Sequence, residues 1–174
     1  KSPLILPVGY GLIANAKTTL TIADDAYIIL NGPLNLYGSN EEPIIIKDGN
    51  GIIVVNAKNE SKIENVIFSN LKSPKNVSTA LTAGINFFNS PVSITKTSFI
   101  KSQSEDAINL FRSDFKIFGS KFENIKSDAL DIDFSDGIIK DTSFNKIEND
   151  AVDVSGSDVS AFNLNINDVL DKAF

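Results

Sequence analysis

Residues 93–174 repeat one pattern almost four times, and this repetition decides the fold. The successive segments read SITKTSFIKSQSEDAINLFRS (93–113), DFKIFGSKFENIKSDALDIDFS (114–135), DGIIKDTSFNKIENDAVDVSGS (136–157) and DVSAFNLNINDVLDKAF (158–174). Phe99, Phe122, Phe144 and Ile166 follow one another at intervals of 23, 22 and 22 residues. A fixed period in the twenties with strand-forming residues is typical of a solenoid, in which each repeat forms one coil.

The residues inside each repeat indicate strands rather than helices. Apolar and polar residues alternate in INL at 108–110, LDI at 130–132 and VDV at 152–154, and this period of two describes a strand with one buried face. No segment keeps the spacing of an amphipathic helix for long, and the leucine framework of leucine-rich repeats is missing. The sequence therefore predicts an all-β fold, a right-handed parallel β-helix with about 22 residues per coil. The handedness follows from the general rule for parallel crossovers.

Stacking explains why such a sequence folds. Coils stacked at about 4.8 Å place each residue on its counterpart in the next coil. The column Phe99, Phe122, Phe144 and Ile166 is then internal, and each buried side chain contributes about 1.5–3 kcal/mol. A second column, Ser90, Ser113, Ser135 and Ser157, recurs at the corners, where we expect the hydroxyls to bond backbone groups.

We interpret residues 1–174 as a single β-helix domain. Residues 1–60 form less regular N-terminal coils and a cap, and residues 61–174 form regular coils. The distance from Phe68 to Phe99 is 31 residues, 9 more than one period, which places a loop insertion at 71–83. Such insertions either collect on a binding face or are tolerated on the surface.

Composition and charge exclude several function classes. The 174 residues include no cysteine and no histidine, which removes thiolate metal sites and the Ser-His-Asp route. No run of 18 apolar residues is present, so we expect no membrane span. Residues 1–100 carry 8 Lys and 7 Asp or Glu, whereas 101–174 carry 8 Lys or Arg and 15 Asp or Glu. The negative charge of residues 101–174 disfavours nucleic-acid binding, so cations, sugars or a basic protein remain as possible ligands.

Two stretches resemble known β-helix proteins. The opening, with LPVGYGLI, TLTIADDAYIILNGPLNLYGS and EEPIIIKDGNGIIVVNA, resembles bacterial secreted right-handed β-helix proteins of the pectate-lyase-like superfamily. The run EDAINLFRS, SDALDIDFSDGII, NDAVDVSGS and DKAF is similar to β-helix segments of large bacterial surface proteins, some of which also carry CotH-type kinase domains. The resemblance implies an extracellular or cell-surface location. It is not specific for function, because this fold hosts lyases, hydrolases, epimerases, adhesins and inert stalks.

Alternation places two polar and aromatic columns on the outer face of one sheet. They are Asn86, Asn109, Asp131 and Asp153, and beside them Phe88, Phe111, Asp133 and Ser155. We predict a ligand-binding surface at Asn86, Phe88, Asn109 and Phe111, with the phenyl rings either contacting sugar rings or covered by the 71–83 loop. We predict that Asp131, Asp133 and Asp153, which repel one another, can bind a cation, for which Ca²⁺ is suited.

Catalysis is the alternative. Asp128 and Asp150 match the corner at which polygalacturonase-like enzymes carry their acid and base, but Asn149 precedes Asp150 and the chain has no histidine. A calcium-dependent lyase would instead use an arginine or lysine base, for which the sequence offers Arg112, the only arginine, and Lys101 or Lys121. These aspartates can equally bond local backbone N–H groups. We therefore expect a non-enzymatic structural, adhesive or glycan-contacting module that needs no cofactor, with a calcium-dependent polysaccharide lyase or epimerase as the alternative.

The end of the repeat predicts a further partner. Phe174 falls in the inward column of Ile108, Leu130 and Val152, and no polar capping segment follows it. An uncapped solenoid end exposes apolar side chains and unpaired strand edges. We expect this end to be covered by further coils of a longer protein or by another subunit, so that the partners are a polysaccharide or a neighbouring protein. The chain, which starts at Lys1 rather than Met, is then a processed product or a fragment.

Overall fold

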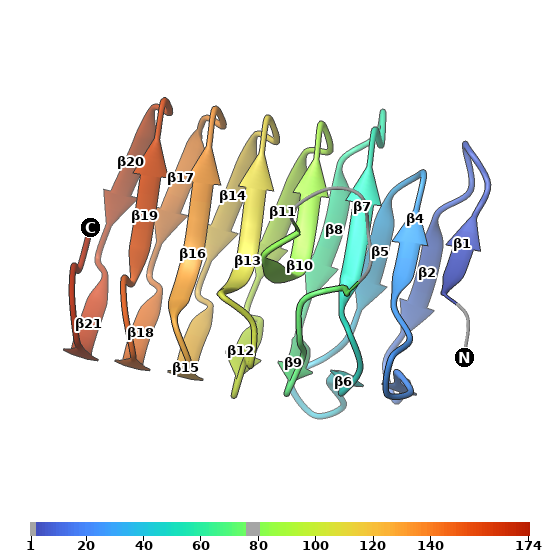
Figure 1. Ribbon diagram of the computed structural model, residues 1–174, viewed down its shortest axis with the longest axis horizontal. Helices are drawn as coiled ribbons and strands as arrows, with labels where there is room; N and C mark the ends of the chain where they lie inside the picture. Colours follow the sequence, from blue (N-terminus) through green and yellow to red (C-terminus); the bar gives the residue numbers. More distant parts are fainter. Residues whose placement is uncertain (1–2, 76–80) are drawn as a thin grey trace.

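The computed structural model describes residues 3–75 and 81–174, and these residues form a parallel β-helix of seven coils (Figure 1). Each coil contributes one strand to each of three seven-stranded parallel sheets, called here sheets A, B and C. In Figure 1 the strands of sheet A rise in front, those of sheet B descend behind, and the chain advances from right to left. This sense is right-handed, so the predicted fold is confirmed.

The strands have the following bounds. Sheet A contains β1 (Leu4–Leu6), β4 (Ile28–Leu30), β7 (Ile52–Val55), β10 (Ala83–Phe88), β13 (Asp106–Phe111), β16 (Asp128–Asp133) and β19 (Val152–Ser155). Sheet B contains β2 (Leu12–Asn15), β5 (Leu34–Tyr37), β8 (Ser61–Glu64), β11 (Val92–Thr95), β14 (Phe115–Phe118), β17 (Gly137–Lys140) and β20 (Val159–Phe162). Sheet C contains β3 (Thr19–Thr21), β6 (Ile44–Lys47), β9 (Val66–Ser69), β12 (Ser98–Ile100), β15 (Lys121–Ile125), β18 (Ser143–Ile147) and β21 (Asn165–Val169).

The core contains the phenylalanine column that the repeat predicts. Phe68, Phe99, Phe122 and Phe144 are buried, and their ring centroids are separated in turn by 5.3, 4.7 and 4.9 Å. Ile166 continues the column in β21. These rings stack because the parallel register puts equivalent residues of successive coils directly beside one another.

The corner between sheets A and B is held by the predicted serine ladder. Ser113 Oγ accepts a hydrogen bond from the backbone N of Ser90 at 3.0 Å, and Ser135 Oγ accepts one from the N of Ser113 at 2.8 Å. Ser157 Oγ accepts in the same way from the N of Ser135 at 2.8 Å. Each hydroxyl also donates to the carbonyl two residues before it. The ladder therefore satisfies buried backbone groups and gives each corner the same shape.

The N-terminal coils follow the same three-sheet plan, and the insertion falls between two of its strands. Residues 4–47 form two coils, with Tyr10 and Gly11 at the corner between β1 and β2. The predicted 71–83 insertion lies between β9 and β10, and its residues 76–80 lie outside the described residues. Gly84 lets the chain pack closely there, because a Cβ at this position would lie 3.0 Å from Leu71 Cβ and 3.2 Å from Ser104 Oγ. Within the described parts of the chain, no helix is long and apolar enough to cross a membrane.

Candidate functional site

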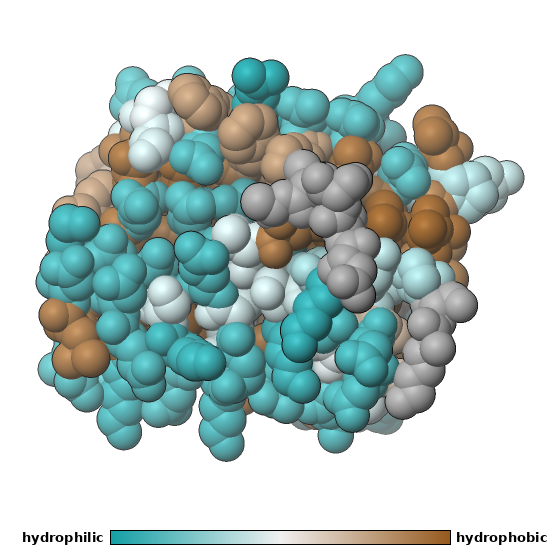
Figure 2. All heavy atoms as spheres, viewed as in Figure 1, coloured by the Kyte–Doolittle hydropathy of each residue, from teal (hydrophilic) through white to brown (hydrophobic). Residues whose placement is uncertain are grey.

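The outer face of sheet A, over β10, β13, β16 and β19, carries most of the candidate residues. The backbone register aligns them in the two columns that alternation predicts: Asn86, Asn109, Asp131 and Asp153, and beside them Phe88, Phe111, Asp133 and Ser155. Figure 2 views the molecule from this side and shows mainly hydrophilic residues over the C-terminal coils, with apolar groups along the upper edge where the strands of sheet A end. We call this surface the sheet A face.

The two asparagines of the sheet A face are engaged within the protein. Asn86 is only 1% exposed, and its Nδ2 donates to the carbonyl of Ala83 at 2.8 Å. The Asn109 amide donates to the carboxylate of Asp131 in the next coil. Asn86 therefore supports the start of β10, whereas Asn109 orients an acidic side chain that remains partly exposed.

The predicted aromatic pair is present, but its rings are largely occupied. Phe88 and Phe111 stack with centroids 4.8 Å apart and an interplanar angle of 27°. The guanidinium carbon of Arg112 lies 5.2 Å from the centroid of Phe111, within the range of a cation–π contact. Phe134 meets Phe111 edge-on, with centroids 5.8 Å apart and an angle of 78°. Phe111 is thus surrounded by three side chains and has little ring surface left for a ligand.

Phe134 is the exposed aromatic of this face, and sequence reasoning missed it. Its side chain is 59% exposed, and its backbone has φ of +50°, which is unusual for a bulky residue. The ring lies over Gly156 of the next coil, where a Cβ would come within 2.9 Å of the ring carbons. A positive φ recurs at the same corner in Asn56, Asn89, Arg112 and Gly156, so it belongs to the geometry of the coils and is not specific to Phe134. The alternation of apolar and polar residues does not report this backbone conformation and therefore offers no signal for the exposed ring.

Three aspartates lie on β16 and β19 of the sheet A face, and one of them, Asp133, directly precedes Phe134. Burial, reinforced by the charge of Asp133, raises the pKa of Asp131 to about 6, although the Asn109 hydrogen bond acts in the opposite direction. Burial and the neighbouring charge of Asp153 also raise the pKa of Asp133. No three acidic side chains of the described residues lie close enough together to hold a metal ion. The calcium site at Asp131, Asp133 and Asp153 therefore stays a prediction that requires these side chains to converge.

A fourth carboxyl group lies buried behind them. Asp106, at the start of β13, is 3% exposed, and its Oδ2 has no hydrogen-bond partner among the described residues. Burial raises the pKa of Asp106 to about 7, against the lowering effect of a hydrogen bond from Thr82, and the charges of Asp131 and Asp128 add to the increase. A buried polar atom without a hydrogen-bond partner is rare in folded proteins. This oxygen therefore distinguishes the end of the sheet A face at which β13 begins.

Of the candidate catalytic residues, Asp128 and Asp150 lie on neighbouring coils, whereas Arg112 lies away from both. Asp128 Oδ1 accepts hydrogen bonds from Asn149 Nδ2 at 2.6 Å and from the Asp150 backbone N at 2.9 Å. Asp150 Oδ1 accepts from the backbone N of Lys172 at 2.8 Å. Each aspartate thus caps the backbone of the following coil. Arg112 lies beyond the opposite end of these strands. It follows Asp106, the residue that pairs with Asp128, by six residues, and six residues of extended chain span roughly 20 Å.

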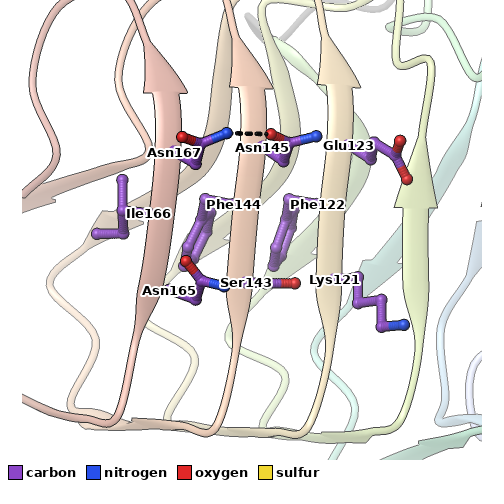
Figure 3. A pocket seen from close by; sticks show the side chains of 9 residues that line it. All are labelled: Lys121, Phe122, Glu123, Ser143, Phe144, Asn145, Asn165, Ile166 and Asn167. Carbon is purple, nitrogen blue, oxygen red and sulfur yellow. Dashed lines mark hydrogen bonds between the residues drawn. The ribbon is translucent and has the colours of Figure 1, made fainter.

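A second polar surface lies on the outside of sheet C. A depression of about 400 Å³ there is lined by Lys121, Glu123, Ser143, Asn145, Asn165 and Asn167, and Figure 3 shows how these side chains lie. Asn167 Nδ2 donates to Asn145 Oδ1 at 2.9 Å, so part of its hydrogen-bonding capacity is used internally. The rings of Phe122 and Phe144 in this region are buried. The sheet A face is the better candidate, because it combines an exposed ring, carboxyl groups with raised pKa values and an unpartnered buried oxygen.

Comparisons with known proteins add no functional assignment. The chain matches no protein-family model, and a search of curated proteins found no match.

Proposed function

We propose that this protein is a non-enzymatic binding module that contacts a glycan through the sheet A face, outside the cell or at its surface. The observation that carries the proposal is the Phe134 ring, which is 59% exposed and directly follows the acidic strand β16. A sugar ring has an apolar face and a rim of hydroxyl groups. An exposed phenyl ring beside carboxylates provides a partner for each of these.

The solenoid supports this function by its repetition. Asp131 and Asp153 occupy the same position in successive coils, and Asn109 precedes them in the same column. A ligand that extends along the helix axis meets a similar polar side chain at each coil. This arrangement favours a polymer over a small molecule, as the concave or flat faces of other solenoids favour extended partners.

The proposed location rests on resemblance. The sequence likeness to secreted β-helix proteins of the pectate-lyase-like superfamily, and to β-helix regions of large surface proteins with CotH-type domains, favours an extracellular or cell-surface role. We rank a calcium-dependent lyase or epimerase second, because Asp128 and Asp150 bond backbone N–H groups and Arg112 contacts Phe111.

The test is a binding measurement with soluble hexasaccharides of glucose, N-acetylglucosamine, glucosamine and galacturonic acid. We expect at least one to bind, and we expect Phe134→Ala to weaken binding about tenfold or more, since truncating a ligand-contacting aromatic typically costs more than about 1 kcal/mol. Phe162→Ala is the matched control, because Phe162 is also exposed but lies at the end of β20 in sheet B. Absence of binding to all four sugars, or equal binding by wild type and Phe134→Ala, would contradict the proposal.

A further inference from the structure

We propose that the ligand of the sheet A face is a glycan that carries protonated amino groups, that is, a polymer of amino sugars with free amines. The inference rests on the proposed glycan-binding function and specifies the chemistry of the sugar. It depends on the arrangement of carboxylates, the aromatic ring and one buried oxygen.

The polar groups that the face offers are almost entirely acceptors. Asp131, Asp133 and Asp153 form no ion pair with any of the described residues. Of the nearby cations, Arg112 lies against the Phe111 ring, and Lys172 pairs with Asp150, while its charge also interacts with Asp153. A carboxylate accepts hydrogen bonds and donates none, whereas an ammonium group donates three and accepts none. An amine is therefore complementary to this surface both in charge and in hydrogen bonding.

Asp106 provides an independent indication of a cationic ligand. Its Oδ2 is buried and unpartnered among the described residues, and its carboxyl group is influenced by the charges of Asp131 and Asp128. Leaving a buried polar atom unsatisfied is unfavourable, so a hydrogen-bond donor that reaches the Asp106 carboxyl group would stabilise this part of the face. An ammonium group is such a donor, and its charge favours ionisation of Asp106, which otherwise keeps its proton up to about pH 7.

Other ligand classes fit less well. An acidic sugar would place its carboxylate against Asp131, Asp133 and Asp153, and like charges at close range repel. A neutral sugar would pair its hydroxyl groups with these aspartates but would leave their charge uncompensated. A lysine-rich peptide supplies amines, but it has no ring to place on Phe134, which is exposed immediately after Asp133.

The decisive experiment compares two ligands that differ at the amino group, which is charged in one and acetylated, and therefore neutral, in the other. Glucosamine hexasaccharide and N-acetylglucosamine hexasaccharide are titrated into the protein by calorimetry at pH 6, where most sugar amines are protonated, and at low salt, with a chelator present so that calcium cannot bridge. We expect the amine form to bind at least tenfold more tightly. In an Asp131→Asn/Asp133→Asn variant we expect this preference to disappear, because the charges that select the amine are gone.

The matched control is Glu123→Gln, which removes a carboxylate from the depression on sheet C and should leave the preference unchanged. Thermal unfolding of each variant checks folding, and Asp133→Asn alone serves if the double variant does not fold. Equal affinity for the two sugars would overturn the amine inference while leaving the proposed function intact, whereas loss of all sugar binding would remove both. Binding that requires added Ca²⁺, or hexalysine that binds as tightly and does not depend on Phe134, would also overturn the inference.

Discussion

Asp106 couples the stability of the fold to pH through a single buried carboxyl group. Burial raises its pKa from 3.8 to about 7, so between these pH values the folded protein keeps a proton that the unfolded chain releases. Stability therefore falls as the pH rises through this window, and the loss is complete above about pH 7. A difference of this size corresponds to a free energy on the order of 3–4 kcal/mol.

We expect Asp106→Asn to remove this pH-dependent loss. The neutral amide cannot ionise, so the variant should exceed wild type in the free energy of unfolding at pH 8 by on the order of 2–4 kcal/mol and match it closely at pH 4. Urea denaturation at the two pH values measures the difference. Asp158→Asn is the control, since Asp158 is exposed. A variant that is no more stable than wild type at pH 8 would show that the buried carboxyl group does not behave in this way.

At the scale of elements, the serine ladder sets the corner between sheets A and B. Ser113 Oγ accepts a hydrogen bond from the backbone N–H of Ser90, and both residues are buried. We expect Ser113→Ala to lower the free energy of unfolding by about 1–3 kcal/mol, because the Ser90 N–H is then left buried without a partner. Ser160→Ala, on the exposed side of β20, should change it by less than about 0.5 kcal/mol. Equal effects of the two substitutions would argue against the ladder as a source of stability.

The strands and their columns could be predicted from the sequence because they depend on periodicity. Phe99, Phe122 and Phe144 recur at one-coil spacing, and this spacing alone brings their rings together. The exposure of Phe134 could not be predicted in the same way. Alternation assigns Asp133 to the outer column, whereas the Phe134 ring is placed by a positive φ and by the glycine at 156 in the next coil. Contacts of this kind join residues of different coils, and the alternation of apolar and polar residues does not predict them.

The same limit applies to the polar residues of the candidate site. Alternation correctly places Asn86 and Asn109 in one outer column. It does not indicate that the Asn86 amide turns back to the Ala83 carbonyl or that Asn109 bonds Asp131. Hydrogen-bond partners depend on local side-chain conformation, which periodicity does not specify. The sequence therefore located the face, and side-chain geometry determines which of its residues are free to bind.

At the scale of the whole molecule, the two ends of the solenoid have strand edges that no described residue pairs. The strands β1, β2 and β3 lie at one end of the three sheets, and β19, β20 and β21 lie at the other. Leu4 shares the inward column of Ile28 but is 51% exposed, and Phe174 at the opposite end is also exposed. Unpaired parallel strands with exposed apolar residues are templates for further strands. Further coils of a longer protein or a second copy would cover the same edges.

We predict that the 174-residue chain associates head to tail when it is produced alone. This contact is heterologous, so it extends into a filament rather than closing into a dimer. The mass measured by light scattering should therefore rise with concentration above the monomer value of 18.8 kDa. Leu4→Lys should reduce the association, because a charge then occupies the inward column at the open end. Ile13→Lys should not, since Ile13 is 69% exposed on the outside of sheet B in the same coil. A stable monomer from micromolar to millimolar concentration, with Phe174 packed against its own chain, would show that the edges do not drive assembly.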